Sequence, residues 1–222
     1  KETELNLEKL KMISPMMKTP YQKARLFEIY TNNYLNFYNS TGSFTAANKI
    51  VPHVLSEINV HQKKLAPVDK HLLYGNLANT YFGLGDYKNC LLWINKIRNE
   101  LPLNLRPDLD SEMRMMNIIV HYELGNADII PHLVISYYRF LRKKSSLSRP
   151  EKLLLIFLKK LPDISTEESL IDKMTGLKKQ FILPESNTSL LQFFDLTSWI
   201  ESKIEKRKFS EIVKGKAQKH LI

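Results

Sequence analysis

The stretch that decides the fold is residues 72–102, which reads LLYGNLANTYFGLGDYKNCLLWINKIRNELP. Its apolar residues recur at three- and four-residue steps up to Leu84, which is the pattern of an amphipathic helix. A second helical pattern follows Gly85-Asp86 and ends at Pro102. Because Gly adopts positive φ without steric cost, this stretch predicts a helical hairpin that turns at Gly85.

Two further segments of the chain follow the same plan of helix, Gly turn and helix. The turns are Thr41-Gly42-Ser43-Phe44 and Leu124-Gly125-Asn126-Ala127, and the three glycines are 43 and 40 residues apart. Strand-like alternation is rare, and no Asn-Gly or Asp-Gly hairpin signal occurs. We therefore expect an all-α fold of nine or ten helices, in which stacked hairpins bury a continuous core.

The middle hairpin resembles the tetratricopeptide repeat (TPR). The positions that carry the resemblance are Tyr74, Leu77-Ala78, Tyr81, Gly85-Asp86-Tyr87, Cys90 at the small-residue position, and Pro102. The resemblance implies a right-handed stack of TPR-like helical hairpins, an α-solenoid. Its expected parts are an N-terminal helix or linker (1–20), about three hairpins (21–146) and C-terminal capping helices (147–222). The chain is similar overall to uncharacterised bacterial proteins that contain this repeat.

The resemblance also implies a function, since the first helices of such hairpins line a concave groove that holds a peptide or protein segment. Amides can both donate to and accept from an extended peptide backbone. The groove positions carried over to this chain are Asn32, Asn36, Asn39, Asn76, Asn79 and Phe82. We therefore predict a non-catalytic binding module, a scaffold or the sensing part of a larger protein. The alternative for these amides is a solvated polar helix face.

The third hairpin replaces the amides with Met115, Met116, Ile119 and Tyr122. Met and Tyr suit adaptable contacts, so these residues could form an apolar end of the groove. They could equally pack against the C-terminal helices, which is the interpretation we favour.

The net charge of +10 is unevenly distributed. After residue 138 the chain holds 18 of its 33 basic residues and only 10 of its 23 acidic ones. A basic half can attract nucleic acid or another anionic partner, and Arg142, Lys143 and Lys144 are the candidate contacts. The plainer alternative is a solvated, Lys-rich helical surface. We expect residues 206–219, which hold six basic residues, to be a solvated or frayed tail.

No sequence motif of catalysis or cofactor binding is present. The six histidines form no H-x-x-x-H pair, the glycines form no phosphate loop, and Cys90 has no second thiol. We therefore predict no enzyme activity, no metal and no cofactor, with Cys90 as a buried small residue.

The longest apolar run, Leu153–Leu158, is far shorter than the ~20 residues that a membrane-spanning helix needs. The polar start at Lys1 is unlike a signal peptide, and its lack of an initiator Met predicts a longer parent protein. A single cysteine fits the cytoplasm, and we expect no contact with a membrane.

Overall fold

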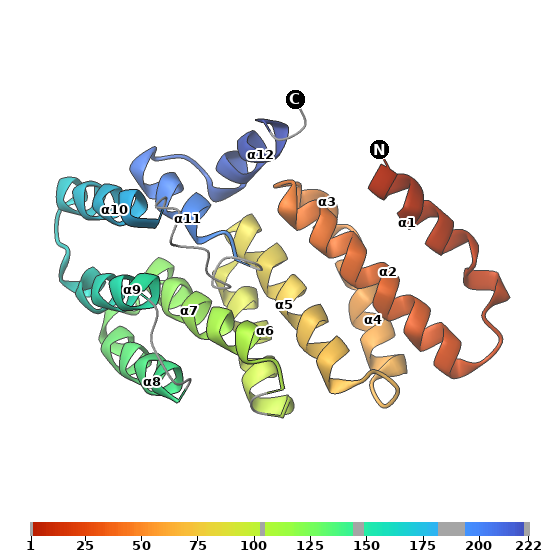
Figure 1. Ribbon diagram of the computed structural model, residues 1–222. Coiled ribbons are helices and arrows are strands. Elements are labelled where there is room, and N and C mark those ends of the chain that lie inside the picture. The colour runs from red at the N-terminus through yellow and green to blue at the C-terminus, as the bar shows by residue number, and fades with distance from the viewer. Residues whose placement is uncertain (1, 103–104, 144–148, 182–193, 220–222) are drawn as a thin grey trace. The chain divides into compact units, whose positions relative to one another are not determined.

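The structure, a computed structural model, describes residues 2–102, 105–143, 149–181 and 194–219 (Figure 1). Within these ranges the chain forms helices, and no strand is present. The prediction of an all-α fold is confirmed at this level. None of the described helices has both the length and the apolar composition needed to cross a membrane.

Twelve α-helices lie in the described ranges, more than the nine or ten expected. They are α1 (Glu2–Met12), α2 (Pro20–Ser40), α3 (Phe44–Asn48), α4 (Val51–His61), α5 (Pro67–Leu84), α6 (Tyr87–Glu100), α7 (Pro107–Glu123), α8 (Ile130–Arg142), α9 (Arg149–Lys160), α10 (Glu167–Phe181), α11 (Leu196–Ile204) and α12 (Phe209–Lys219). Short 3-10 turns occupy Ser14–Met16, Ala127–Ile129 and Leu161–Asp163.

Local breaks in the chain account for the larger number of helices. Pro52 is the second residue of α4, and it separates α4 from the five-residue α3 because proline cannot continue a helix across its own position. Lys206 has a φ of 53°, and a new helix, α12, begins three residues later. The prediction of a solvated tail is therefore wrong from Phe209 onward, since Ile212 and Val213 of α12 are buried.

The three predicted glycine turns share one geometry. Gly42, Gly85 and Gly125 have φ values of 69°, 76° and 73°. After each glycine, the next amide donates to a carbonyl five residues back: Ser43 to Tyr38 at 2.8 Å, Asp86 to Tyr81 at 2.9 Å and Asn126 to His121 at 2.9 Å. This is the Schellman termination of a helix, which satisfies carbonyls that the helix leaves unpaired. The predicted positive φ is confirmed at all three glycines.

The described part of the chain divides into two compact units, and we describe each by itself. The first unit holds the residues up to Arg106 and those from Lys214, and the second holds Pro107–Val213. The predicted division at residues 20 and 146 rests on the repeat pattern and stays a prediction.

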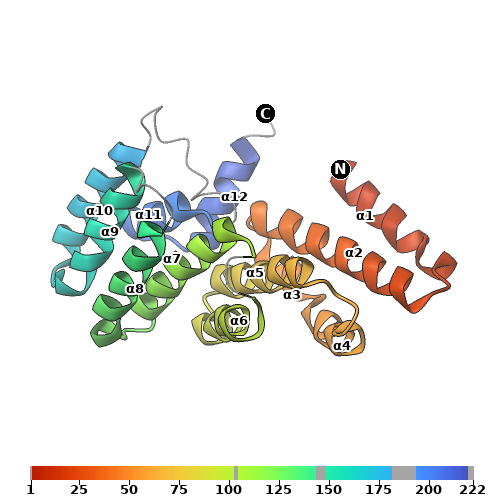
Figure 2. The same cartoon turned by 60° about the horizontal axis from the view of Figure 1, so that its bottom comes forward.

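In the first unit, α2 and α5 lie side by side, and α6 pairs with α5 (Figure 2). Helix α3 packs on both α2 and α5, and α1 packs on α2. The resemblance positions Tyr74, Leu77, Ala78 and Cys90 are buried, so Cys90 is the buried small residue that we expected. A Cβ added at Gly83 would overlap the ring of Phe44, so glycine allows α3 to approach α5 closely.

In the second unit, α7 pairs with α8, α8 with α9, α9 with α10, and α10 with α11. Met115, Met116 and Ile119 of α7 are fully buried, so these three residues do not line an open groove; their packing against the C-terminal helices stays a prediction. Glu123 ties α11 to α7, because its carboxylate accepts from the indole N–H of Trp199 at 2.7 Å and pairs with Lys203 at 2.6 Å.

Candidate functional site

The asparagines predicted on α2 differ sharply in exposure. Asn36 is exposed, Asn32 is half-buried, and Asn39 keeps only 9% of its surface accessible. On a helix, residues three and four apart lie on neighbouring positions of one face. The amide row of α2 therefore runs from an open position into the contact between α2 and α5.

Asn39 forms hydrogen bonds across this contact with both of its amide atoms. Its Nδ2 donates to the backbone carbonyl of Asn76 at 3.0 Å, and its Oδ1 accepts from the hydroxyl of Thr80 at 2.9 Å. The same hydroxyl lies 3.0 Å from the Asn76 carbonyl, so the Asn39 amide, the Thr80 hydroxyl and the Asn76 carbonyl are all within hydrogen-bond distance of one another. The amide atoms of Asn39 are thus engaged within the fold, where buried polar groups require partners.

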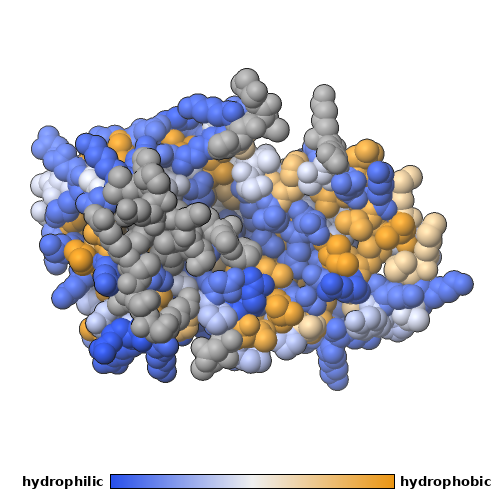
Figure 3. Space-filling view, viewed as in Figure 1, coloured by the Kyte–Doolittle hydropathy of each residue, from blue (hydrophilic) through white to orange (hydrophobic). Residues whose placement is uncertain are grey.

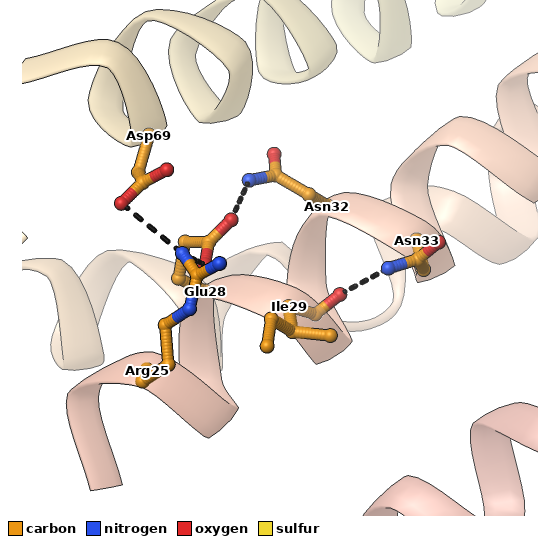
Figure 4. Close-up of polar contacts among 6 residues, drawn as sticks. All are labelled: Arg25, Glu28, Ile29, Asn32, Asn33 and Asp69. Carbon is orange, nitrogen blue, oxygen red and sulfur yellow. Dashed lines mark hydrogen bonds and ion pairs between the residues drawn. The ribbon is translucent and has the colours of Figure 1, made fainter. Parts of the chain in front are cut away.

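A second polar set continues along the same two helices. The Asn76 amide donates to Asn32 Oδ1 at 3.1 Å, and Asn32 donates in turn to Glu28 at 3.1 Å. Glu28 also pairs with Arg25, whose guanidinium lies 3.3 Å from the carboxylate of Asp69 on α5 (Figure 4). We call Asn32, Asn39, Asn76 and Thr80 the amide seam of α2 and α5.

Glu28, beside the amide seam, is a buried carboxylate. Its burial raises its pKa above the ordinary value, and the hydrogen bond from Asn32 opposes that rise. The neighbouring Asp69 also raises the pKa of Glu28, whereas Arg25 lowers it. Glu28 is held by its ion pair with Arg25 and by the hydrogen bond from Asn32, and Arg25 links it to α5. These partners account for the buried charge of Glu28 without a bound ligand.

The remaining groove candidates, Asn79 and Phe82, are buried on α5. The ring of Phe82 meets that of Tyr87 edge to face, with centroids 5.4 Å apart. Four of the six residues predicted to bind a peptide are therefore buried, and Asn36 is the one that lies fully at the surface. Peptide binding by the six residues stays a prediction.

The basic residues of the alternative prediction lie at the end of α8. Arg142 and Lys143 are exposed, and Lys144 lies outside the described residues. The guanidinium carbon of Arg142 lies 5.8 Å from the ring centroid of Tyr138, one helical turn earlier. A helix C-terminus favours cations through its dipole, so part of this charge has a structural role.

Tyr138 also lines an apolar groove between α8 and α9, which run antiparallel (Figures 1 and 2). We call this feature the α8–α9 groove. Its volume is about 460 Å³. The lining residues are Pro131, Val134, Ile135 and Tyr138 of α8 and Lys152, Leu155, Ile156 and Lys159 of α9.

Besides the exposed Pro131, three large apolar side chains of the groove are open to solvent: Ile135 is 48% exposed, Tyr138 is 42% exposed and Ile156 is 55% exposed. The groove is not among the predicted sites, although the sequence carries a signal of it. The run Leu153–Leu158 is apolar at six consecutive positions and so covers every face of α9. A surface helix buries only one stripe, so part of such a run must stay outside the core.

A second cavity, a cleft of about 590 Å³, lies between α1, α2 and α4 in the first unit. Figure 3 shows hydrophobic residues gathered over the α1 and α2 part of that unit. At the cleft, His61 Nε2 lies 3.2 Å from a carboxylate oxygen of Glu57. The buried Nδ1 of His61 has no hydrogen-bond partner among the described residues.

Groups that could carry chemistry are few in the part of the chain that the structure describes. There, no cluster of three His, Cys, Asp or Glu side chains has the proximity to hold a metal ion. Burial raises the pKa of the Cys90 thiol well above its ordinary value, which disfavours the reactive thiolate.

Comparison with known proteins returned no match: no protein-family model fits the chain, and neither curated proteins nor solved structures resemble it significantly. The TPR resemblance therefore rests on the residues quoted above.

Proposed function

We propose that this chain is a non-catalytic helical-repeat module that binds a segment of another protein. In this proposal its hairpins stack as TPR-like units closed by the C-terminal helices, and it serves as a scaffold or the sensing part of a larger, cytoplasmic protein. The three equivalent Schellman turns and the buried Tyr74, Leu77 and Ala78 support the TPR-like interpretation. A single buried cysteine is compatible with the cytoplasmic setting.

The observation that carries the binding proposal is the α8–α9 groove. Its three open apolar side chains line one hollow, whereas scattered single apolar residues are ordinary on protein surfaces. Covering the exposed half of such a side chain contributes about 1 kcal/mol. Three of them in one groove therefore supply a useful part of the free energy of a micromolar complex, which is about 8 kcal/mol.

The amide seam has a different role in this proposal. Asn39 and Asn76 already hydrogen-bond within the contact of α2 and α5, so a peptide would have to break those bonds to use them. We assign these two amides to helix packing. Asn36, which is exposed on the same helix, is the residue with which peptide binding by the α2 face can be tested.

A capture experiment tests the proposed function. The chain is used as bait in lysate of its source cell at about 50 mM and about 300 mM salt, where screening of exposed charges differs strongly. Each captured protein is identified, purified and titrated against the parent and three variants. The variants are Ile156→Ser in the groove, Leu92→Ser as a matched apolar control on α6, and Asn36→Ala.

We expect Ile156→Ser to weaken binding of the purified partner about tenfold, because it removes exposed apolar contact area from the wall of the groove. Leu92 is 47% exposed but lies outside the groove, so Leu92→Ser should bind like the parent. Equal affinity of Ile156→Ser and the parent would refute the groove as the working surface. If only Asn36→Ala weakens binding, the α2 face is the binding site instead.

The second candidate function is binding of nucleic acid or another anionic partner by the basic second half. It is favoured by the exposure of Arg139, Arg142 and Lys143 at one helix end. Its test is the affinity for a fluorescent oligonucleotide over a range of salt. Phosphate contacts require that the logarithm of the association constant fall linearly with the logarithm of salt concentration and that binding weaken in Arg142→Ala. Salt-independent or absent binding rejects this candidate.

A further inference from the structure

We propose that the α8–α9 groove takes an amphipathic helix of a partner protein whose acidic residues, seven positions apart, flank apolar ones. This inference rests on the proposed function and adds the chemistry of the partner. It follows from three properties of the groove: the kind of wall it has, the spacing of its two lysines, and its charge.

The walls of the groove decide the conformation of the partner segment. Both walls are α-helices, whose backbone amides and carbonyls are already hydrogen-bonded within the helix. An extended peptide laid between them would leave its own backbone groups without partners, at a cost for each buried group. A helix satisfies its backbone internally and presents only side chains, so the groove suits a helix.

The two lysines set the spacing of charges along that helix. Lys152 and Lys159 line the groove from α9 and are seven residues apart, which is about 10 Å along a helix axis. Two turns of helix return to nearly the same face, so both ammonium groups border the same side of the groove. A partner helix aligned with α9 has the same rise and therefore matches these lysines with acidic residues seven positions apart.

The apolar part of the partner follows from the residue between the lysines. Ile156 lies four residues after Lys152 and three before Lys159, and it is more exposed than Ile135 or Tyr138. Apolar residues at the third and fourth positions after the first acidic residue of the partner would cover Ile156. Across the groove, Ile135 and Tyr138 offer two more apolar contacts.

The charge of the groove favours an acidic partner over a basic one. Within the described ranges neither Lys152 nor Lys159 has a carboxylate at ion-pair distance. The guanidinium of Arg142, near the ring of Tyr138, adds positive charge. Complementary charge accelerates association and suppresses partners of the wrong sign. The two lysines therefore attract an acidic helix electrostatically and repel a basic one.

The test is a fluorescence-anisotropy titration of the whole chain with labelled, alanine-based helical peptides of about four turns. The first peptide has two glutamates seven positions apart and two leucines at the third and fourth positions after the first glutamate. The second has lysines in place of the glutamates, and the third has serines in place of the leucines. The proteins are the parent, the double variant K152E/K159E, Ile156→Ser, and the charge-matched control K63E/K64E.

We expect the parent to bind the glutamate peptide at least tenfold more tightly than either of the other peptides. K152E/K159E should lose at least tenfold affinity for the glutamate peptide and gain affinity for the lysine peptide. Ile156→Ser should weaken binding of the glutamate peptide about tenfold. Lys63 and Lys64 are exposed in the first unit, so K63E/K64E should stay within about twofold of the parent.

The failures of the two proposals give different results. Equal binding of the glutamate and lysine peptides, still lost in Ile156→Ser, overturns the acidic partner but leaves groove binding standing. Failure of every peptide to bind overturns this inference, while the proposed function is decided by its own titration with the purified partner. Two more results overturn the inference of an acidic helix as partner. One is that phosphatidylglycerol vesicles, and not the peptides, bind through Lys152 and Lys159. The other is that the chain forms a dimer that Ile156→Ser abolishes.

Discussion

The amide seam makes a sharp prediction for two asparagines that lie three residues apart on α2. Asn39→Ala removes a side chain that donates to the Asn76 carbonyl at 3.0 Å and accepts from the Thr80 hydroxyl at 2.9 Å. Asn36→Ala makes the same chemical change at an exposed position of the same helix. The pair therefore separates the effect of the seam from the effect of the substitution.

The expected magnitude follows from three contributions. Two lost hydrogen bonds cost about 2 kcal/mol of unfolding free energy, at about 1 kcal/mol for each. The small cavity left by the buried amide costs about 1 kcal/mol more. Alanine returns about 0.5 kcal/mol because it is the better helix former. Asn39→Ala should therefore destabilise by about 2.5 kcal/mol, whereas Asn36→Ala should stabilise by about 0.5 kcal/mol through helix propensity alone.

Native-state hydrogen exchange measures the loss of stability at the contact of α2 and α5 itself. Urea unfolding followed by circular dichroism gives the global change, but a chain with two compact units need not unfold in one step. The exchange rates of the backbone N–H groups of α2 and α5 report the free energy of local opening directly. A loss of about 2.5 kcal/mol should accelerate their exchange by roughly 50- to 100-fold in Asn39→Ala.

The result that would refute this reasoning is equal exchange of α2 and α5 in the two variants. Asn39 would then not be held between the helices, and its amide would be available to a ligand. Faster exchange in Asn39→Ala alone would support the assignment of the seam to packing. Thr80→Val offers an independent check, since it removes the hydroxyl that Asn39 accepts from but keeps the shape of the side chain.

Three further predictions concern stability and reactivity. Gly83→Ala should lower the melting temperature, because its methyl group would meet the Phe44 ring, whereas Gly75→Ala has open space and should raise stability by up to about 1 kcal/mol. Thermal melts of the two variants check the contrast, and equal shifts would contradict it. Cys90 should resist a thiol reagent in the native protein and react only on unfolding in urea, since its thiol is buried and its pKa is raised; rapid native labelling would show that α6 opens readily. Glu123→Gln should destabilise the second unit by about 2 kcal/mol or more, because it removes the partner of a lysine and weakens the bond to the indole of Trp199. Tryptophan emission during urea unfolding reports that change, and an unchanged midpoint would argue against the contact.

The helix type and the turns could be predicted from the sequence because their causes are local. Gly85 adopts positive φ in the structure, as the pattern around it predicted, and the amide that follows it closes the helix. Tyr74, Leu77 and Ala78 belong to the same helical pattern and are buried, as the repeat resemblance implies for these positions. The same local reasoning failed after residue 206, where the density of lysines obscured two buried apolar residues of α12.

The candidate site was harder to predict because exposure depends on neighbours that are distant in sequence. Helical spacing placed Asn32, Asn36 and Asn39 together on α2, and it could not tell which of them α5 would cover. The partner atoms of Asn39 are 37 and 41 residues away in the chain. No local pattern specifies such a pairing.

The α8–α9 groove shows the same contrast between what the local sequence determines and what tertiary packing determines. By itself the sequence determined that Leu153–Leu158 is an apolar run, which exceeds what one buried stripe of a helix can hold. Only the tertiary structure decided that Ile156 is left at the surface while Leu154 and Leu158 are buried. The reason is physical: backbone dihedrals and helix ends respond to adjacent residues, whereas burial is settled by which other helix packs on each face.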